Sequence, residues 1–239
     1  MRARIAAAPG VIARCLALVS ILLFNPHAAV ALAGVTAAVV ADLRAAEGTD
    51  TLLVVVGERG DATRAAFFAF ARRDGVWREV FSASAFVGRG GIVAAADKRE
   101  GDGKTPAGVY ALGRAFGVLD DPGSKIAYTK LRPGDCWVDD PQSRHYNTWA
   151  KADAPDKDWR SAENLARETI AYAHVLVIEY NTRPVAPGAG SAIFLHCSTG
   201  RATAGCVSVS ESVMKKALAF AGPDTRIVIA PSLEALAGY

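Results

Sequence analysis

A histidine and two cysteines lie close together in the segment FLHCSTGRATAGCVSVS, residues 194–210. His196 and Cys197 are adjacent, and Cys206 follows nine positions after Cys197. Imidazole and thiol groups can bind a metal ion, and two thiols can form a disulfide. A thiol beside an imidazole can also act as a nucleophile that is activated by a base. These three chemistries make different demands on the spacing.

A zinc site fits this spacing least well. Structural zinc needs four ligands, which usually occur in pairs at short spacings. His196 and Cys197 are neighbours in an apolar, strand-like run, so their side chains are expected to point to opposite faces. The other candidate ligands, Cys136, His145 and His174, lie upstream at spacings that do not suit zinc. We therefore expect no metal site.

The cysteine count leaves the disulfide alternative open. Cys15 lies in an N-terminal segment that we expect to be removed, so three cysteines remain: Cys136, Cys197 and Cys206. In an oxidising compartment an odd count leaves at least one thiol unpaired. A bond between Cys136 and Cys197, or between either of them and Cys206, is compatible with the sequence.

The nucleophile interpretation explains more of the segment. His196 ends the apolar run AIFLH, and Cys206 begins the run CVSVS after Ala204 and Gly205. Two neighbouring strand ends can bring the imidazole within hydrogen-bond reach of the thiol, and an imidazole at that position favours the reactive thiolate. Gly205 places no side chain before the nucleophile, so a carbonyl can approach, and backbone N–H groups are expected to be free for an oxyanion.

The elements that must position these residues are mostly strands. Short β-prone runs separated by turn residues such as Asp74-Gly75 are typical of strands and antiparallel hairpins. The runs are TLLVVVG (51–57), TRAAFFAFAR (63–72), VWREVFSASAFVG (76–88), AGVYAL, HVLVIEY, AIFLH, CVSVS and RIVIA. Apolar spacing predicts helices over 158–173 and over 210–222, the second with Ser210 as its N-cap. We therefore expect a mainly β or α+β domain, with a turn-rich insertion over 115–160.

The N-terminus has the form of a secretory signal peptide. Three arginines precede the apolar run CLALVSILLF (15–24), and the segment ends with Ala31-Leu32-Ala33. The run is shorter than the roughly 18 apolar residues that a membrane span needs, although an uncleaved anchor is the alternative. We predict that residues 1–33 are removed and that 34–239 form a single domain. The mature protein would be exported to the periplasm or cell envelope, without stable membrane insertion.

Charge and motifs exclude two other classes of function. The formal net charge of the 239 residues is only +3, and no basic stripe with interleaved aromatics is present, so we expect no nucleic-acid partner. The segment GDGKTP (101–106) resembles the end of a phosphate-binding loop. The required first glycine is replaced by Lys98, and Pro106 precedes a strand-like run instead of a helix. We expect a turn here and no phosphate site.

Taken together, several motifs resemble one known family. The segment HCSTGRATAGC resembles the His…[Ser/Thr]-x-Gly-Cys signature of the L,D-transpeptidase catalytic domain, the YkuD-type, ErfK/YbiS-like family. The segments REGDGKTPAGVYALGRAFG, CWVDDPQSRHYN and VIEYNTRPVAPGAGSAIFLH are similar to its surroundings in exported bacterial members. The resemblance runs from about residue 50 to 231 and implies a mixed β-sandwich that carries a cysteine nucleophile. It also implies action on peptidoglycan stem peptides without a metal or organic cofactor.

The resemblance assigns roles to positions of this sequence. Cys206 would be the nucleophile and His196 its base, with Gly205 and Thr203 completing the signature. Gly205 would be part of the catalytic centre, and Thr203 would help to bind substrate. Many members have an arginine two positions after the cysteine, where this chain has Ser208. Arg201 is a candidate to replace it in binding substrate, with a solvated surface arginine as the alternative. In the segment CWVDDPQSRHYN, Tyr146 and Asn147 are candidates for a substrate-binding cleft wall, with a solvated turn as the alternative.

The reaction implied by the resemblance passes through a thioester on Cys206. Attack by an amine of a second stem peptide would give a cross-link, which is peptidoglycan L,D-transpeptidation. Attack by water would make the protein an L,D-carboxypeptidase. A third alternative is a non-catalytic module that binds the cell wall and keeps the fold.

Overall fold

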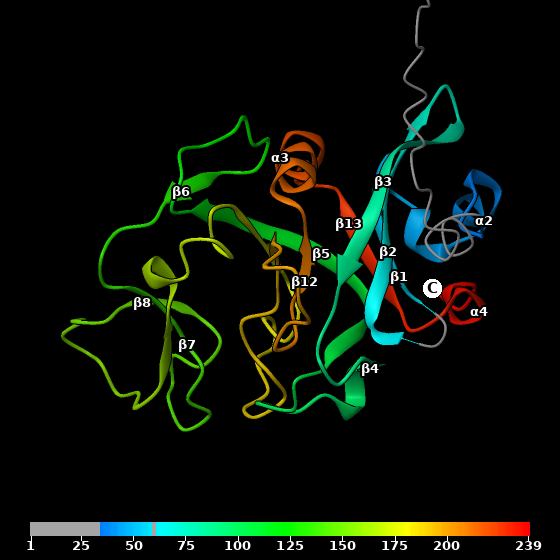
Figure 1. Cartoon of the computed structure of the whole chain (residues 1–239). Helices are drawn as coiled ribbons and strands as arrows, with labels where there is room; N and C mark the ends of the chain where they lie inside the picture. Colours follow the sequence, from blue (N-terminus) through cyan, green and yellow to red (C-terminus); the bar gives the residue numbers. More distant parts are fainter. Residues whose placement is uncertain (1–33, 59–60) are drawn as a thin grey trace, which may run out of the picture.

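The computed structural model describes residues 34–58 and 61–239, so the predicted signal peptide, residues 1–33, lies outside the described residues. The described part is mostly β, as the sequence predicts, with few helices (Figure 1). Its strands are β1 Thr51–Glu58, β2 Asp61–Arg73, β3 Val76–Phe86, β4 Ile92–Ala94, β5 Thr105–Gly117, β6 Tyr128–Lys130, β7 Asp135–Val138, β8 Trp149–Lys151, β9 Ala162–Asn164, β10 Val175–Ile178, β11 Phe194–Cys197, β12 Val207–Val209 and β13 Arg226–Ala230. Its helices are α2 Ala37–Ala41, α3 Glu211–Phe220 and α4 Leu233–Leu236, with short 3₁₀ turns η1 Arg44–Ala46, η2 Ala95–Asp97 and η3 Leu165–Arg167.

The main sheet is mixed and folds back on itself. Its strand order is β10-β11-β12-β3-β2-β1-β13-β5-β4, and β6 also pairs with β5. The long strand β5 bonds to β13 through its first half and to β10 through its second half. This double pairing joins β10, at one end of the sheet, to β5 near the other end, so that the sheet closes on itself. The predicted mixed sandwich therefore takes the form of one sheet whose two halves face each other.

The core lies between the two halves of this sheet. Strand β1 is apolar on both faces, and Leu53 and Val55 point into the main cluster together with Leu176 and Leu195 from the other half. The neighbouring residues of β1 point outward into a second cluster, which α2 and α4 cover on the other side of the sheet (Figure 1). Because β1 is buried on both faces, it reads in the sequence as a continuous apolar run.

A second, three-stranded sheet, β8-β7-β9, packs beside the main sheet. Its Trp137 ring meets the Phe194 ring of β11 edge to face, with the ring centroids 5.0 Å apart. Sequence alone predicted a helix over 158–173, and that prediction is wrong. Residues Ala162–Asn164 instead form β9, which pairs with β7, and a 3₁₀ turn follows. Pairing with β7 and the burial of Trp159 and Leu165 outweigh the helical spacing of the apolar residues.

The other predicted helix is confirmed as α3. Ser210 caps it by accepting a hydrogen bond from the Val213 amide at 3.4 Å, and the helix ends at Phe220. Met214, Ala217 and Leu218 lie on its buried face, against the main core. The predicted turn at Asp74-Gly75 is also present, with both residues at positive φ. Local signals were reliable where packing did not oppose them.

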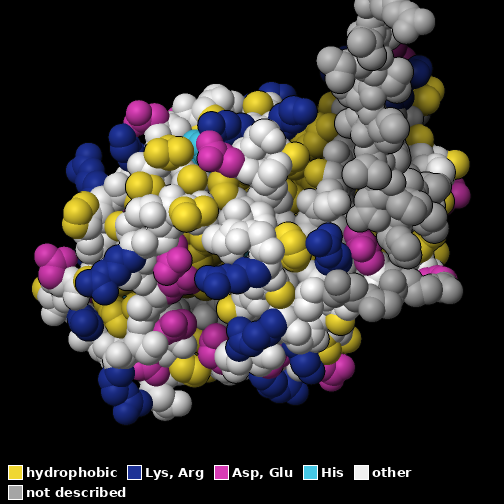
Figure 2. Space-filling view, in the orientation of Figure 1, with side chains coloured by type: hydrophobic (Ala, Val, Ile, Leu, Met, Phe, Trp, Pro, Cys, Tyr) yellow, Lys and Arg dark blue, Asp and Glu magenta, His cyan; other side chains and the backbone are white. Residues whose placement is uncertain are grey.

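The surface carries both signs of charge. On the face drawn in Figure 2, lysines and arginines are interspersed with aspartates and glutamates. None of the helices within residues 34–58 and 61–239 is long and apolar enough to cross a membrane.

Candidate active site

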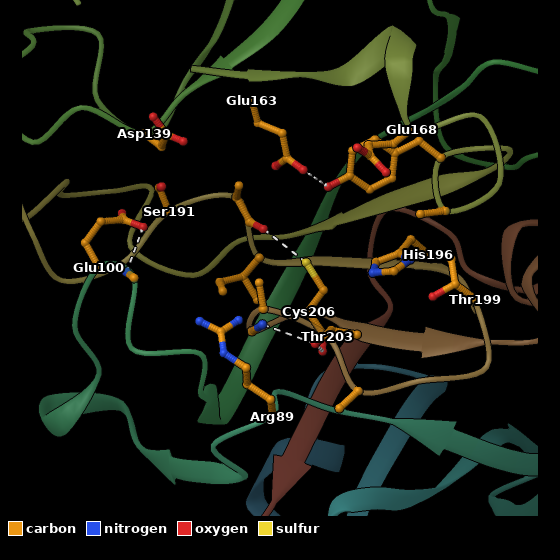
Figure 3. A pocket seen from close by; sticks show the side chains of 18 of the residues that line it. Arg89, Glu100, Asp139, Glu163, Glu168, Ser191, His196, Thr199, Thr203 and Cys206 are labelled. Carbon is orange, nitrogen blue, oxygen red and sulfur yellow. Dashed lines mark hydrogen bonds between the residues drawn. The ribbon is translucent and has the colours of Figure 1, made fainter. Parts of the chain in front are cut away.

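A pocket of about 530 Å³ lies where the small sheet faces the ends of β11 and β12. His196, Thr203, Gly205 and Cys206 all line it (Figure 3). Arg89, after β3, lies below the Cys206 sulfur in Figure 3, Glu100, after β4, lies at the left, and Glu163 and Glu168 lie above. The signature residues of the sequence are therefore brought together in one cavity.

Strands β11 and β12 position the two central side chains. They run parallel, with His196 opposite Ser208 in the register. His196 faces the pocket, whereas Cys197 points into the main core, so the two neighbours lie on opposite faces as predicted. Cys206 lies immediately before β12, at the end of the loop that begins after β11. The loop returns the chain to the neighbouring strand, which places the thiol and the imidazole in the same pocket.

The Cys206 thiol is 8% exposed and is held by backbone groups. It donates a hydrogen bond to the Ala192 carbonyl at 3.2 Å, and its sulfur accepts one from the Phe194 amide at 3.4 Å. Burial raises the pKa of this thiol to about 12, and the nearby Glu163 carboxylate adds to the rise. In the substrate-free pocket the thiol therefore keeps its proton at neutral pH.

His196 is 7% exposed, and its Nδ1 atom lies 2.9 Å from the Cys197 carbonyl oxygen. A carbonyl only accepts, so Nδ1 carries the proton and Nε2 is left with a lone pair. The edge of the Tyr172 ring packs against the imidazole, with the centroids 5.6 Å apart. Burial lowers the pKa of His196 to about 4, so the imidazole is neutral and has the tautomer of a base.

These two pKa directions correct the sequence-based expectation of a thiolate. We expected an imidazole beside Cys206 to lower the thiol pKa, but burial raises the pKa of Cys206 and lowers that of His196. Desolvation disfavours the charged form of each group. The resting pair is therefore a neutral thiol with a neutral imidazole, and not a thiolate–imidazolium ion pair.

Hydrogen bonds to Thr203 and Thr105 fix the backbone of the nucleophile. The Thr203 hydroxyl donates to the Cys206 carbonyl at 2.6 Å, and the Thr105 hydroxyl donates to the same oxygen at 3.3 Å. Gly205 has a φ of +151°, and a Cβ atom there would lie 3.0 Å from the Lys104 carbonyl oxygen. Its N–H donates to the Thr203 hydroxyl at 3.1 Å. The expectation that this particular N–H is free for an oxyanion is therefore wrong.

The remaining predicted site residues divide into two groups. Arg201 is exposed and lines the pocket. Tyr146 and Asn147 are buried and do not line it. The Asn147 amide accepts from the Trp137 indole at 2.8 Å and from the Ala192 amide at 3.1 Å. Asn147 thus holds the small sheet against the segment whose carbonyl binds the Cys206 thiol, and its geometry is that of a positioning residue.

The Tyr146 hydroxyl has a similar supporting place. It donates to the Glu100 carboxylate and accepts a hydrogen bond from the Gly190 amide at 3.0 Å. Elsewhere in the same segment, Asp140 accepts from the amides of Gln142 and Arg160, as a turn residue does. Of the segment CWVDDPQSRHYN only Asp139 lines the pocket. The cleft-wall interpretation of Tyr146 and Asn147 is therefore wrong, since both lie behind the pocket, and Asp140 fits the capped turn.

Sequence reasoning missed several residues that line the pocket. The Arg89 guanidinium lies below the thiol in Figure 3, and Asp139, Glu163 and Glu168 lie above it. Arg89 follows β3, far from the signature in sequence, and its amide donates to the Thr203 carbonyl at 2.9 Å. A charged residue directly after a strand, as Arg89 and Asp139 are, was the only signal in the sequence. That signal is too common to single them out.

No disulfide links the cysteines of the described residues. Cys136, Cys197 and Cys206 are all free, so the pairing alternatives left open by the sequence are excluded here. Cys136 lies in the small sheet and Cys197 in the main core. Within the described ranges, no three histidine, cysteine or acidic side chains are placed to hold a metal ion.

Ser208, which occupies the place of an arginine in many relatives, does not reach the pocket. Its side chain is 1% exposed, and its hydroxyl has no hydrogen-bond partner. Any carboxylate that enters the pocket must therefore find its cation elsewhere. Arg89 and Arg201 line the pocket and are exposed.

The comparison with protein families agrees with this geometry. The model of the L,D-transpeptidase catalytic domain, YkuD, matches residues 51–229. The chain belongs to this family. The matched range runs from β1 to β13 and includes every residue of the pocket. This L,D-transpeptidase-type domain is therefore of a catalytic family that is associated with peptidoglycan.

Two further comparisons add little. No curated protein matches the chain. Among solved structures, one titled "Structure of Bdellovibrio bacteriovorus Bd1075" is 18% identical, with a TM-score of 0.42. The alignment covers 77% of this chain and 49% of that one, so this chain spans about half the length of the matched structure.

Proposed function

We propose that this protein is a peptidoglycan L,D-transpeptidase that uses Cys206 as its nucleophile and His196 as its base. The observation that carries the proposal is the meeting of a buried thiol and a neutral imidazole of base-competent tautomer in one pocket. Membership in the family supports the same reaction class. Thr203, Thr105 and Gly205 act as positioning residues for the nucleophile.

The first step forms the thioester. The Cys206 thiol leaves the Ala192 carbonyl and gives its proton to Nε2 of His196, while the sulfur attacks the carbonyl of the third stem residue. The peptide bond to the terminal D-amino acid breaks, and the imidazolium returns the proton to the departing amine. Bringing thiol, base and carbonyl together in one pocket supplies the proximity that this step needs. The acyl group remains on the sulfur.

The second step decides between the two enzymatic outcomes. A side-chain amine of another stem peptide attacks the thioester, loses a proton to His196 and releases the Cys206 thiol. The product is a cross-link between two third residues. If water attacks instead, the product is a shortened stem peptide, which is L,D-carboxypeptidase activity. Arg201, exposed in the loop before Cys206, is placed to contact either substrate.

We also propose that the protein works outside the cytoplasm. Its predicted substrate is a cell-wall polymer, and its N-terminus has the form of a signal peptide. Fractionation of cells, with N-terminal sequencing of the exported form, tests this directly. A mature chain that begins near Gly34 in the periplasm or envelope supports it, and an unprocessed cytoplasmic chain contradicts it.

Incubation with purified tetrapeptide muropeptides, followed by mass spectrometry, tests the reaction. We expect an acyl adduct on the tryptic peptide that contains Cys206, release of the terminal D-amino acid and a cross-linked dimer. Shortened stems without dimers would identify a carboxypeptidase. Binding without adduct or product would leave only the wall-binding module.

The matched control removes the other two thiols. The Cys136→Ala, Cys197→Ala double variant should keep its rate of acylation within about tenfold, because neither thiol lines the pocket. If this double variant lost the adduct while Cys206→Ala kept it, the nucleophile would be Cys136 or Cys197 and not Cys206.

A further inference from the structure

The charges of the pocket are unevenly distributed. Three of its four carboxyl groups lie on the side of the Cys206 sulfur that faces the small sheet, and the Arg89 guanidinium lies on the opposite side (Figure 3). The fourth, Glu100, is held by the Tyr146 hydroxyl and the Gly101 amide. We call the three carboxyl residues the acidic wall: Asp139, Glu163 and Glu168. All come from the chain around the small sheet, since Asp139 follows β7, Glu163 lies in β9 and Glu168 follows η3. On the outer face in Figure 2, by contrast, the two signs of charge are interspersed.

The acidic wall is not used up by contacts within the protein. Asp139 Oδ1 is buried and has no hydrogen-bond partner. One Glu163 oxygen accepts from the Tyr172 hydroxyl at 2.5 Å, a neutral donor that leaves the carboxylate charge uncompensated. No salt bridge joins any of the three to a lysine or arginine of the described residues. Carboxyl groups that border a cavity and have no ion-pair partner are expected to bind a cationic group of a ligand.

A second observation points to a polar ligand at the same place. Ser191 lines the pocket, is 8% exposed, and its hydroxyl lies beside that of Tyr146 without a hydrogen bond of good geometry. In Figure 3 it lies on the side of the pocket near Asp139. A buried hydroxyl that borders a cavity and is left without a partner gains a hydrogen bond when a donor or acceptor enters.

The acidic wall fits an ammonium group better than it fits a metal ion. Within the described ranges no three acidic, histidine or cysteine side chains are close enough together to hold a metal. An ammonium donates up to three hydrogen bonds and binds carboxylates and hydroxyls separated by more than a metal's coordination distance. Burial raises the pKa of Glu163 to about 7, and like charges on Glu168 and Asp139 add to the rise. A bound cation would offset the unfavourable free energy of ionising Glu163 in this environment.

The opposite side of the pocket suits a carboxylate. Arg89 is exposed to the pocket, and no acidic side chain of the described residues forms a salt bridge with it. Lys98, also in the lining, is already paired with Asp102 at 2.8 Å. An unpaired guanidinium presents two parallel N–H groups and binds a carboxylate in bidentate fashion. The volume of about 530 Å³ lies within the range of pockets that enclose a small ligand.

We infer that the acidic wall binds the side-chain ammonium of the third stem residue while Arg89 binds the carboxylate of the departing residue. The inference rests on the proposed function, because it assigns the two ends of the donor peptide on either side of Cys206. The pocket then selects stem peptides whose third residue carries a free amine, and it disfavours peptides in which that amine is blocked.

A binding measurement on an acylation-incompetent protein tests the selection separately from the chemistry. Calorimetry with Cys206→Ala uses two probes, the tetrapeptide L-Ala-γ-D-Glu-L-Lys-D-Ala and the same peptide with Nε-acetyl-lysine. We expect the free-amine peptide to bind about tenfold to a hundredfold more tightly, the value of a hydrogen bond to a charged group. The ratio of the two affinities should fall toward one when Glu163→Gln is added, and should fall further when Glu168→Gln is also added.

Two controls make the result specific. Glu47→Gln removes the same charge from an exposed glutamate that does not line the pocket, and it should leave the ratio unchanged. Arg89→Gln should weaken the binding of both peptides by the same factor. It should also abolish the preference for a peptide with a C-terminal carboxylate over the same peptide with a C-terminal amide. Circular dichroism of each variant checks that the fold is kept, and Glu163→Asp, which keeps the charge, should restore part of the ratio.

Failure of this inference is distinct from failure of the proposed function. Equal affinity for the two peptides, no binding of either, or a ratio that survives Glu163→Gln with Glu168→Gln would overturn the acidic wall as an ammonium site. None of these outcomes depends on turnover. An acyl adduct on wild-type Cys206 from both peptides at the same rate would uphold the nucleophile while the selection fails.

Discussion

Strand β11 carries a cysteine–histidine environment on each of its faces. On one face His196 shares the pocket with Cys206, and on the other Cys197 lies in the main core beside His174. Both thiols donate to a backbone carbonyl, that of Ala192 for Cys206 and that of His174 for Cys197. Burial raises both thiol pKa values, to about 12 and about 11. Residue type, burial and titration therefore do not tell the two environments apart.

Access and backbone support do tell them apart. Cys206 borders the pocket and receives an amide hydrogen bond from Phe194, whereas Cys197 is 2% exposed and is packed among apolar side chains. The imidazole of His196 presents Nε2 toward the pocket, while Nδ1 of His174 lies 3.1 Å from the Tyr128 hydroxyl in the core. Access to a cavity therefore distinguishes Cys206, the proposed nucleophile, from Cys197 more clearly than the neighbouring histidine does.

The largest expected contrast is between the two cysteines. Cys206→Ser should lower acylation by more than about 10³-fold, because a hydroxyl beside a neutral imidazole is a much weaker nucleophile. Cys197→Ser, the same exchange on the other face, should leave acylation nearly unchanged. Adduct formation with muropeptides, followed by mass spectrometry, measures both. Activity retained in Cys206→Ser would remove the distinction between the two faces.

The two histidines should differ by a smaller factor. His196→Ala removes the base and should lower acylation by about 10²–10⁴-fold, the usual contribution of general-base catalysis. His174 lies outside the pocket, so His174→Ala should lower the stability of the fold and leave acylation within a few fold of wild type. Added imidazole should restore part of the activity of His196→Ala and none of any loss in His174→Ala. Equal losses in the two variants would contradict the assignment of the base.

The pH dependence of alkylation separates a neutral pair from an ion pair. Thiolate is the reactive form, so a pKa raised to about 12 means that alkylation of Cys206 should be slow at pH 7 and still rising above pH 10. A free thiol with a pKa near 8.5 levels off earlier. Because burial lowers the pKa of His196 to about 4, His196→Ala should leave this profile almost unchanged.

Peptide mapping after iodoacetamide treatment gives the profile for each cysteine in one experiment. A plateau of Cys206 reactivity near neutral pH that disappears in His196→Ala would show an ion pair instead. Cys197 should react more slowly than Cys206 at every pH, since alkylation there also requires the core to open.

The smallest effect is expected at Ser208, opposite His196 in the register of β11 and β12. Its buried hydroxyl has no partner, so Ser208→Ala should be neutral or stabilise the fold by up to about 1 kcal/mol. Urea denaturation measures this, with acylation as the second readout. A clear loss of acylation at unchanged stability would show that the hydroxyl positions His196.

The sequence alone carried much of the fold and the centre of the site. The main strands and α3 were predictable because apolar runs, turn residues and a capping serine act locally. His196, Gly205, Thr203 and Cys206 were predictable because they share one loop between neighbouring strands. Spacing already favoured Cys206 with His196 as the candidate pair, and the resemblance to a known signature assigned the same two residues their roles.

The remainder depended on packing that no local pattern reveals. The segment 158–173 has helical spacing, yet pairing with β7 turns it into β9 and brings Glu163 to the pocket. Arg89 enters the site only because its strand ends beside Thr203. The raised thiol pKa follows from desolvation, which depends on how the surrounding segments bury Cys206 and not on the neighbouring imidazole. Each of these features is set by contacts between segments far apart in the chain.

The pairing of β1 with β13 has a consequence for the order of events during synthesis. Leu52 lies opposite Arg226 in this register, and β13 fills the gap between β1 and β5. Strand β1 therefore has no permanent neighbour on one side until residues 226–230 have been made. Contacts of such long sequence separation slow folding. The chain should remain open, without a formed pocket, until β13 arrives, so that truncation before β13 should yield no partially active protein.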